Sequence, residues 1–456
     1  MSTFDSKSNF TVSKVQCLNL SKCPNPINTG IGFFDHMLDQ LNSHAQVGIS
    51  VTVQKNDASE TMNDLSNHNR YAETIELQEE IVKLVGQAVG FELHSLLSKN
   101  STGAKSSRFC CPLDEALVEC LLISNEDGTG SLSRFTLPPY GSFPKGGRTK
   151  IGSWGTCHVK SFFEAIAESM QIDISLVKMR GHNGHHIVES SFKAFSRALR
   201  NLLDGVDIDS MSTLSEELQA SEEKKETHDD FDKLWGIDSD SFKMGMEMER
   251  QGKIERCTKE TAIVVDAKLI PPSMKDSIFI KTGIPMLDTI FSELATHAGM
   301  QLHISCKGDL HIDDHHSAED VAIAFGKVLN TALGTKAGLN RMWLGKVSVG
   351  DCTVEVTMDL SNRPCLTSNL SLATLSSEEL VKGLSLEMVD HVLDSIVMNG
   401  QMTVHVMEVM SKPGPNAMED LLIATARAFG KALKMCMSVD PRRKGATASS
   451  KGTLSV

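Results

Sequence analysis

Residues 29–44 read TGIGFFDHMLDQLNSH, and residues 282–297 read TGIPMLDTIFSELATH. Gly, Ile, Asp, Leu and His recur between the two stretches at a constant offset of 253 residues. Further along, Ser196-Arg197-Ala198 matches Ala426-Arg427-Ala428 at an offset of 230 residues. Fixed registers of this kind indicate an internal duplication. We therefore expect two copies of one domain, at residues 1–205 and 246–456, joined by an acidic, polar linker at 206–245.

Each copy combines strand and helix patterns. Alternating apolar and polar residues predict strands, and apolar residues at helical spacing predict helices. The strands are expected at 46–53, 299–307, 354–360 and 402–407, and the helices at 75–96, 185–203, 318–333 and 419–435. This mixture predicts an α/β (α+β) fold in which helices cover one face of a sheet. A second, fainter repeat predicts that each copy is itself a doubled sheet-plus-helix unit.

Composition excludes several classes of protein. The chain has 456 residues and a formal net charge of −13, which argues against a general nucleic-acid binder. It contains no apolar run long enough to span a membrane and no signal-peptide pattern at its start. Its 11 cysteines show no CxxC spacing, which favours reduced thiols and a cytoplasmic location.

Two short segments share an unusual pattern, HHxxE. They are His185-His186-Ile187-Val188-Glu189 and His315-His316-Ser317-Ala318-Glu319. If each segment opens a helix, its adjacent histidines project about 100° apart and can face different metal ions. The glutamate lies three and four residues later, on the same side of the helix. Two such segments facing each other would supply the ligands of a two-metal site.

These motifs resemble the imidazoleglycerol-phosphate dehydratase family of histidine biosynthesis. The resemblance rests on five stretches, and it extends over nearly all of both copies outside the linker. They are FFDHMLDQLNSH, LHIDDHHSAEDVAIAFGKVL, GHNGHHIVESSFKAFSRALRNLL, DLSNRP and the C-terminal PRRKGATASSKGTL. The resemblance implies two Mn²⁺ ions at each site, which is built between subunits, and one such domain in each subunit of the family. This chain has two.

The metal ligands that the resemblance implies are divided between the copies. Copy 1 has lost its first histidine pair, at Ile75 and Glu76 ahead of Glu79, and has Ser161 at the histidine position of the H-F-F motif. Copy 2 has Thr289 at the histidine position of the DHM motif and Pro415-Asn416 in place of the second pair. The retained ligands are His36, His185, His186 and Glu189 in copy 1, and His315, His316, Glu319 and His391 in copy 2. Neither copy has the full set, so we infer one composite site made of complementary halves.

Residues for substrate and phosphate binding are implied by the same resemblance. Arginine forks and a lysine point charge hold a phosphomonoester well in an acidic protein. The expected residues are Gln40, Lys193, Arg341, Arg363, Ser449 and Lys451. Glu260 is the candidate for proton transfer, and Glu189 and Glu319 are grouped with it as catalytic carboxylates. The family motif L-D-E-A-L is present at 113–117, but Val349-Gly350-Asp351 stands in its place in copy 2.

The expected function is dehydration of imidazole glycerol phosphate to imidazole acetol phosphate. Two alternatives stay open: a catalytically inactive or regulatory scaffold of the same fold, and a metal-dependent phosphohydrolase. Family members form shells of about 24 domains, so the resemblance implies a homo-oligomer of about 12 chains. It does not say whether the two halves of a site meet within one chain or between chains.

Overall fold

The computed structural model describes residues 9–18, 27–56, 69–71, 74–100, 103–125, 128–206, 250–269, 278–375, 379–443 and 445–454. The chain forms two compact units, at 1–224 and 225–456. Each unit has its own sheets and helices. The linker expected at 206–245 lies outside the described residues except for Val206, so its boundaries stay a prediction.

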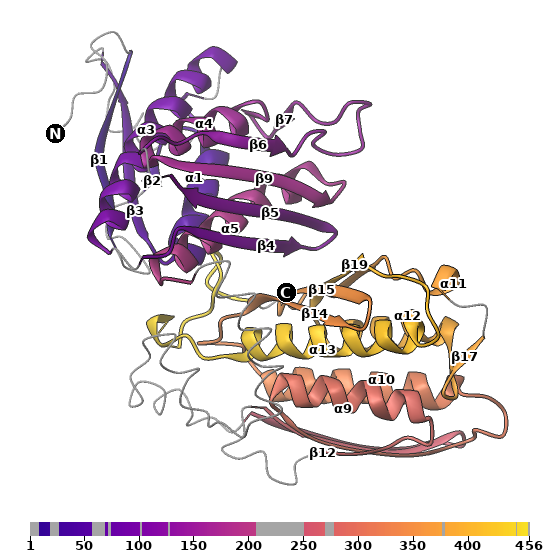
Figure 1. Ribbon diagram of the computed structural model, residues 1–456. Coiled ribbons are helices and arrows are strands. Elements are labelled where there is room, and N and C mark those ends of the chain that lie inside the picture. Colours follow the sequence, from indigo (N-terminus) through magenta and orange to yellow (C-terminus); the bar gives the residue numbers. More distant parts are fainter. Residues whose placement is uncertain are drawn as a thin grey trace. The chain divides into compact units, whose positions relative to one another are not determined.

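The first unit contains two repeats of strands and helices (Figure 1). The first repeat comprises β1 (Phe10–Leu18), β2 (Ile27–Asn28), α1 (Gly32–Gln40) with a π-helical turn at Leu41–Ala45, β3 (Gly48–Lys55) and α3 (Ile75–Lys99). The second comprises β4 (Ser106–Leu113), β5 (Ala116–Ser124), β6 (Leu132–Thr136), the short β7 (Lys150–Ile151) and β8 (Trp154–Gly155), α4 (His158–Met170), β9 (Ile172–Arg180) and α5 (Gly184–Leu203).

The second unit repeats this order. Its first half comprises β10 (Gln251–Cys257), β11 (Thr261–Lys268), β12 (Ile278–Lys281), α9 (Pro285–Ala298), β13 (Gln301–Gly308) and α10 (His315–Leu333). Its second half comprises β14 (Met342–Val349), β15 (Cys352–Asp359), β16 (Cys365–Ser368), α11 (Leu372–Leu375), β17 (Leu380–Val381), β18 (Leu384–Ser385), α12 (Leu386–Gly400), β19 (Thr403–Met410), α13 (Ala417–Met437) and a 3₁₀ turn at Pro441–Arg443.

The sheets of the three complete repeats have the same topology. Their strand orders are β4-β5-β9-β6, β10-β11-β13-β12 and β14-β15-β19-β16. In each sheet the first three strands pair antiparallel and the last pairs parallel. The remaining sheet, β1-β3-β2, has the same antiparallel and parallel pairs, and the described residues include no counterpart of β10. The doubled sheet-plus-helix unit predicted from the sequence is therefore confirmed.

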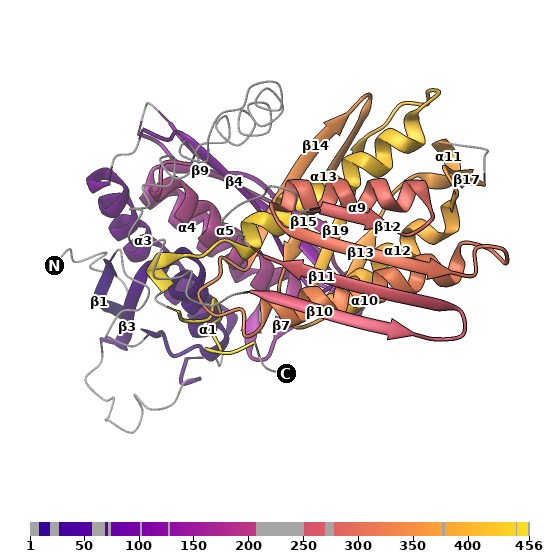
Figure 2. The ribbon, with the colours of Figure 1, turned by 90° about the horizontal axis from the view of Figure 1, so that it is seen from below.

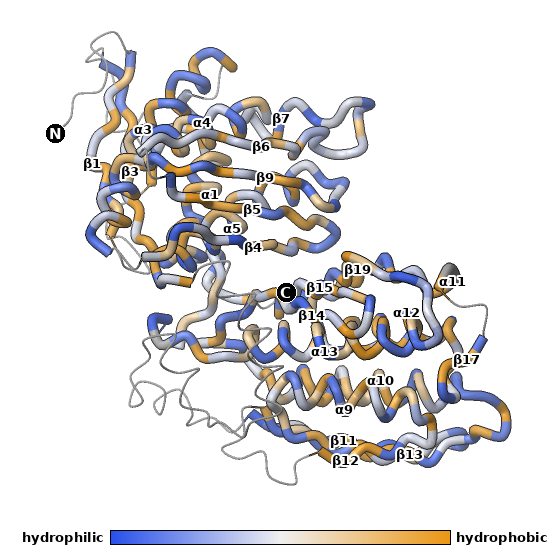
Figure 3. Tube along the Cα trace, in the orientation of Figure 1, coloured by the Kyte–Doolittle hydropathy of each residue, from blue (hydrophilic) through white to orange (hydrophobic). Residues whose placement is uncertain are grey.

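Helices lie between the two sheets of a unit. In the second unit, Figure 1 shows α9 and α10 over one sheet and α12 and α13 under the other, and Figure 2 shows the β10–β11 hairpin along the edge of its sheet. Apolar segments run along these helices in Figure 3. The side chains of Phe291, Phe325 and Phe429 are buried where the helices meet. Burial of these apolar faces against the sheets and each other drives the layered arrangement.

Every repeat turns from its first helix into the following strand through a left-handed residue. Gln46, Gln171, Gly299 and Gln401 have φ values of 53°, 57°, 63° and 52°. The left-handed conformation ends a helix because it lets the chain reverse while backbone groups of the last turn stay hydrogen-bonded. The chain then returns along the sheet, and in the first half of the second unit Ile284 and Asp314, just before α9 and α10, line the same pocket.

A threonine and an aspartate stabilise the start of the first helix in both units. The Thr29 amide and hydroxyl donate to Asp35 Oδ1 at 2.8 and 2.6 Å, and those of Thr282 donate to Asp288 Oδ1 at 2.7 and 2.6 Å. A carboxylate in the first turn also interacts favourably with the helix dipole. The repeated T-G-I-x-x-x-D pattern therefore encodes a local structure.

The strands and helices predicted from the sequence are all present. Their ends differ by a few residues: the helix expected at 318–333 begins at His315, and the strand expected at 46–53 is β3, at Gly48–Lys55. Both HHxxE segments open helices, α5 and α10, as expected.

Gly326 allows α10 and α12 to approach closely. A Cβ atom at this position would lie 2.8 Å from the Ile396 carbonyl oxygen and 2.9 Å from Asn399 Cβ. We expect Gly326→Ala to lower the free energy of unfolding by about 1–3 kcal/mol, because overpacking outweighs the gain in helix propensity. Urea denaturation measures this change. The adjacent, exposed Lys327 provides the control, since Lys327→Ala should change stability by less than about 0.5 kcal/mol. Equal stability of both variants would contradict the close helix contact.

Candidate metal centre

The start of α5 is held by a capping side chain. Asn183 Oδ1 accepts hydrogen bonds from the backbone amides of His185 and His186 at 3.0 and 3.4 Å. This satisfies amides that have no partner within the helix. Most of α5 beyond the histidines is buried, so the pair is presented from a rigid element.

The first unit gathers three possible metal ligands. His36 from α1 and His185 and Glu189 from α5 place their ligand atoms within 4.8 Å of one another. Glu189 Oε2 lies 3.1 Å from His185 Nε2 and 3.9 Å from His36 Nε2. We call these three residues cluster A.

Lys193 lies one helical turn beyond Glu189 and pairs with it. Its Nζ is 2.8 Å from Glu189 Oε1, and both side chains are largely buried. Burial opposes ionisation of Glu189, but the Lys193 charge and the hydrogen bonds from His185, His36 and Lys193 outweigh it, so the pKa of Glu189 lies well below its usual range. Glu189 is therefore a carboxylate at neutral pH, as a metal ligand must be.

The second unit gathers a matching group from different motifs. His315 and Glu319 from α10 and His391 from α12 place their ligand atoms within 4.8 Å of one another. Glu319 Oε1 lies 3.1 Å from His391 Nε2, and Glu319 Oε2 lies 3.7 Å from His315 Nε2. The His315 and His391 rings stack with centroids 5.4 Å apart. We call these three residues cluster B.

The second histidine of each pair points away from its own cluster. The rings of His185 and His186 are inclined by 81°, and those of His315 and His316 by 90°. His186 Nδ1 lies 2.7 Å from Glu115 Oε2, and its Nε2 lies 3.7 Å from Asp114 Oδ2. His316 Nδ1 lies 3.0 Å from Asp309 Oδ2.

In the first unit, Glu79 lies among polar side chains. Glu79, at the place corresponding to Glu319, accepts hydrogen bonds from Ser161 at 2.9 and 3.0 Å and lies 2.8 Å from His158 Nδ1. The Lys83 ammonium is 2.9 Å from Glu79. A lysine therefore supplies the positive charge next to Glu79. We call Glu79 and its counterpart in the second unit, Glu419, the relic carboxylates.

The second unit treats its relic carboxylate in the same way. Glu419 follows Pro415-Asn416, which stand in place of the second histidine pair. It forms an ion pair with Lys382. Neither Glu79 nor Glu419 belongs to a group of three possible metal ligands among the described residues.

Arg341, one of the phosphate-binding residues predicted from the sequence, binds groups of its own unit. Arg341 is buried, and its Nε and Nη2 donate to Asp359 at 2.7 and 2.8 Å. Its Nη1 donates to the Ala448 carbonyl oxygen, next to Ser449. Arg341 thus fastens the C-terminal segment that carries Ser449 and Lys451.

A second buried cation holds the same segment. Lys336 donates to Asn362, and Asn362 Nδ2 donates to the Leu454 carbonyl oxygen at 3.0 Å. Burial lowers the pKa of Lys336 to about 8. Arg363 lies next to Asn362, so the D-L-S-N-R-P turn and the C-terminal segment are tied together.

Gln40 and its counterpart Glu293 have different surroundings. The buried Gln40 donates from Nε2 to the His36 carbonyl oxygen at 3.0 Å, which places it one turn from cluster A. In the second unit, Glu293 accepts two hydrogen bonds from Arg427 at 2.9 and 3.1 Å. Copy 2 therefore has Glu293 where copy 1 has Gln40, and this glutamate forms an ion pair with Arg427 of the same unit.

Glu260 lies in the β10–β11 hairpin near cluster B. Its backbone amide donates to Thr258 Oγ1 at 3.2 Å, and its carboxylate is exposed. Its charge contributes, after the stronger effect of Asp309, to a raised pKa of His316. The proton-transfer candidate therefore lies on the same side of the unit as His316.

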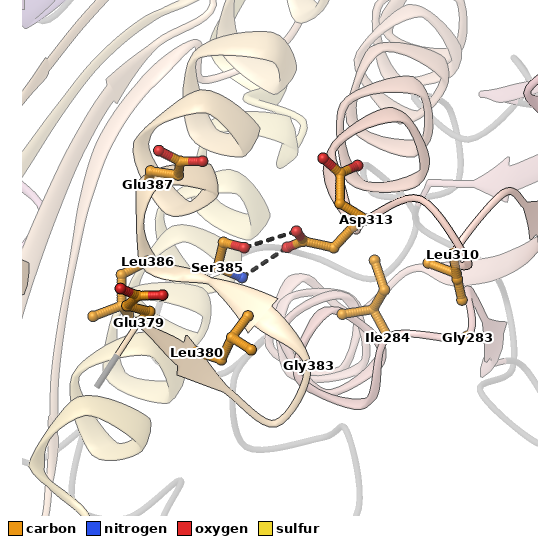
Figure 4. A pocket seen from close by; sticks show the side chains of 11 residues that line it. Gly283, Ile284, Leu310, Asp313, Glu379, Leu380, Gly383, Ser385, Leu386 and Glu387 are labelled. Carbon is orange, nitrogen blue, oxygen red and sulfur yellow. Dashed lines mark hydrogen bonds between the residues drawn. The ribbon is translucent and has the colours of Figure 1, made fainter.

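A pocket of about 780 Å³ lies at the N-terminal ends of α9, α10 and α12 (Figure 4). Ser385 donates from its amide and hydroxyl to Asp314, the residue before His315, both at 2.7 Å. The lining residues include carboxylates and no cationic side chain: Gly283, Ile284, Leu310, Asp313, Asp314, Glu379, Leu380, Gly383, Ser385, Leu386 and Glu387. Its negative potential disfavours phosphate.

The structure thus brings three of the four predicted metal ligands together within each unit and directs His186 and His316 elsewhere, and the roles of all eight residues stay predictions. Sequence reasoning did not select Glu115 or Asp309, which contact His186 and His316. The L-D-E-A-L motif was a signal for Glu115, since it is lost in the copy that also lost the second histidine pair.

The fold and these clusters define a class of protein: duplicated α/β chains with histidine and carboxylate clusters at helix N-termini. The model of the family "Imidazoleglycerol-phosphate dehydratase" matches residues 29–199 and 282–433, in agreement with a tandem duplication. The chain belongs to the imidazoleglycerol-phosphate dehydratase family, a family of carbon–oxygen lyases.

Individual relatives match about one copy of the domain. Chloroplastic imidazoleglycerol-phosphate dehydratase of Pisum sativum is 39% identical over 206 residues, covering 45% of this chain and 69% of the relative. The enzyme of Gloeobacter violaceus is 36% identical over 199 residues, covering 44% and 95%. The crystal structure of the Staphylococcus aureus enzyme is 24% identical, with a TM-score of 0.35, covering 42% and 99%. Among the described helices, none has the length and apolar composition needed to cross a membrane.

Loss of the Arg341 guanidinium should destabilise the second unit. We expect Arg341→Met to lower the free energy of unfolding by about 3–5 kcal/mol, because it leaves the fully buried Asp359 without its partner. Urea denaturation of the metal-free protein measures this change. The double variant Arg341→Met/Asp359→Leu should recover much of the loss. A single variant with normal stability and impaired substrate binding would instead indicate a direct phosphate contact.

Proposed function

We propose that the chain dehydrates imidazole glycerol phosphate to imidazole acetol phosphate, a step of histidine biosynthesis, at a composite di-metal site. The observation that carries the proposal is the complementarity of clusters A and B. Each unit retains one group of three possible ligands, from motifs that the other unit has lost. An inactive scaffold would have no need to keep a complete set.

The ligand clusters fit a divalent metal. Each combines two imidazole nitrogens with a carboxylate, and the atoms lie close enough to contact one ion. This donor set suits Mn²⁺ among several divalent ions, and family resemblance favours Mn²⁺. We propose two Mn²⁺ ions at each composite site, one at cluster A and one at cluster B.

The diverging histidines provide the connection between the halves. Because His186 turns away from cluster A, we propose that it completes the coordination of the ion at cluster B. His316 in turn completes the coordination of the ion at cluster A. Each ion would then have three ligands from one copy and one from the other, and neither copy would bind its ion fully alone.

The two halves can belong to one chain or to neighbouring chains of a homo-oligomer. By resemblance we propose an assembly of about 12 chains, corresponding to about 24 domains. The partner at the site is in either case another copy of this domain. A cytoplasmic location is part of the proposal; the similar plant enzymes are named as chloroplastic.

Different residues of the chain would transfer the proton and bind the phosphate of the substrate. A divalent ion, when bound, acts as a Lewis acid on the imidazole ring and makes the neighbouring C–H more acidic. Glu260, on the exposed hairpin, is placed to accept or return a proton. Arg363, Lys193, Ser449 and Lys451 hold the phosphate, while Arg341 fastens the segment with Ser449. Fixing the remote phosphate lowers the entropic part of the barrier.

Carboxylates of the active and relic positions should differ in importance. We expect Glu189→Gln and Glu319→Gln each to lower kcat by at least about 100-fold, because each removes a charged metal ligand. The matched controls Glu79→Gln and Glu419→Gln should stay within about threefold of the parent, since neither glutamate follows a histidine pair or belongs to cluster A or B. A steady-state assay with imidazole glycerol phosphate and added Mn²⁺ measures both. Large losses in the control pair would show that the relic positions also work.

Metal content tests the number of complete sites. We expect about two Mn²⁺ ions per chain at saturation, because clusters A and B are the only ligand groups of this kind among the described residues. Elemental analysis of the dialysed protein gives this ratio. About four ions per chain would mean that the relic positions bind metal. Two ions without turnover would favour the inactive scaffold.

A further inference from the structure

The second histidine of each pair contacts a carboxylate that belongs to neither metal cluster. Glu115 lies in the turn between β4 and β5, and Asp309 follows β13. Their oxygens lie 2.7 Å from His186 Nδ1 and 3.0 Å from His316 Nδ1. An ionised carboxylate can only accept, so Nδ1 of each ring donates and Nε2 of the neutral ring keeps its lone pair. Both rings are thereby prepared to bind an ion through Nε2.

We propose that Glu115 and Asp309 are positioning residues, which fix the tautomer and direction of His186 and His316. The inference rests on the proposed function, because it assigns these two histidines to the metal ions. Outer carboxylates of this kind orient an imidazole ligand and increase its basicity.

Glu115 is itself held in place. Its Oε1 accepts hydrogen bonds from the backbone amides of His182 and Asn183 at 3.2 and 2.8 Å. Asn183 is also the residue that caps α5 and anchors the amides of the histidine pair. One carboxylate thus joins the β4–β5 turn, the loop before α5 and the ring of His186. The direction of that ring therefore depends on the β4–β5 turn and on the loop before α5, and not on its rotamer alone.

Copy 2 has not kept this arrangement at the position corresponding to Glu115. The hairpins β4–β5 and β14–β15 align with Asp114 over Gly350, which have similar φ values of 49° and 52°. Glu115 then corresponds to Asp351, whose exposed carboxylate pairs with Lys412 at 3.3 Å. Copy 2 has no histidine pair at this place, so the shorter acid has no ring to hold.

Copy 1 has correspondingly not kept the position of Asp309. Strands β3 and β13 align with Lys55 over Gly308, at the same offset of 253 residues as the helices before them. Asp309 then corresponds to Asn56, which accepts a hydrogen bond from Thr11. The carboxylate is present only in the copy that keeps the histidine. The orienting acids are therefore divided between the copies in the same way as the ligands.

Metal affinity of the full chain tests the proposal. We expect Glu115→Ala and Asp309→Asn to weaken binding of one Mn²⁺ ion by about 10–100-fold, with Glu115→Gln intermediate because its amide oxygen can still accept. Competition with a chelator, followed by the electron paramagnetic resonance signal of free Mn²⁺, measures the affinity. Activity of the variants should return at high Mn²⁺, and the melting temperature of the metal-free Glu115→Gln and Asp309→Asn variants should be unchanged. If the variants instead lost activity through misfolding, high Mn²⁺ would not restore activity and the melting temperature would fall.

Two further variants separate the possible failures. Asp351→Asn is the matched control, since this acid faces Lys412, and it should bind Mn²⁺ like the parent chain. His186→Ala should lose one ion. If His186→Ala loses an ion while Glu115→Ala, Glu115→Gln and Asp309→Asn bind normally, the positioning role is wrong and the proposed function stands. If His186→Ala retains both ions with normal affinity, the crossed metal site itself is wrong.

Discussion

Neighbouring side chains leave an α-helix about 100° apart, and this constraint governs the arrangement of the ligands. A helix that begins with two histidines directs them to two different points. The structure shows this divergence at both helices, where the ring planes are nearly perpendicular. The first histidine joins a glutamate one turn later, and the second faces an outer carboxylate. In the proposed site this divergence lets each pair contact two ions, and a second surface completes each of them.

Duplication gave the chain two such surfaces, and their later changes are coordinated. Where a unit lost its ligands, hydrogen bonds and a nearby lysine compensate the remaining carboxylate, as at Glu79 and Glu419. In clusters A and B the carboxylates lie beside two imidazoles, and Glu189 also pairs with Lys193. Unpaired charge at a partly buried place is costly, and the ion pairs with Lys83 and Lys382 offset that cost at Glu79 and Glu419.

The sequence predicted the duplication, the layered α/β class and the ligands within each cluster, because these depend on local periodicity and short motifs. The start of α10 at His315 also depends on neighbouring residues. The Asp313 carboxylate, two residues earlier, accepts a hydrogen bond from the His315 amide. The contacts of Glu115 and Arg341 could not be predicted from periodicity or short motifs. Glu115 reaches His186 across 71 residues, and Arg341 reaches Asp359 and Ala448 through the folded core. A motif gives the identity of a residue, while its orientation depends on contacts that form only on folding.

Both clusters are open to solvent in a single unit, since His36, His185, His315 and His391 each expose more than a third of their side chains. An accessible group of two imidazoles and one carboxylate binds zinc or copper more strongly than manganese. Under the proposed metal sites, a newly made and unassembled chain would therefore be susceptible to binding the wrong metal. Assembly in the presence of the correct ion would then serve as a kinetic filter, trapping a metal that affinity alone would not select.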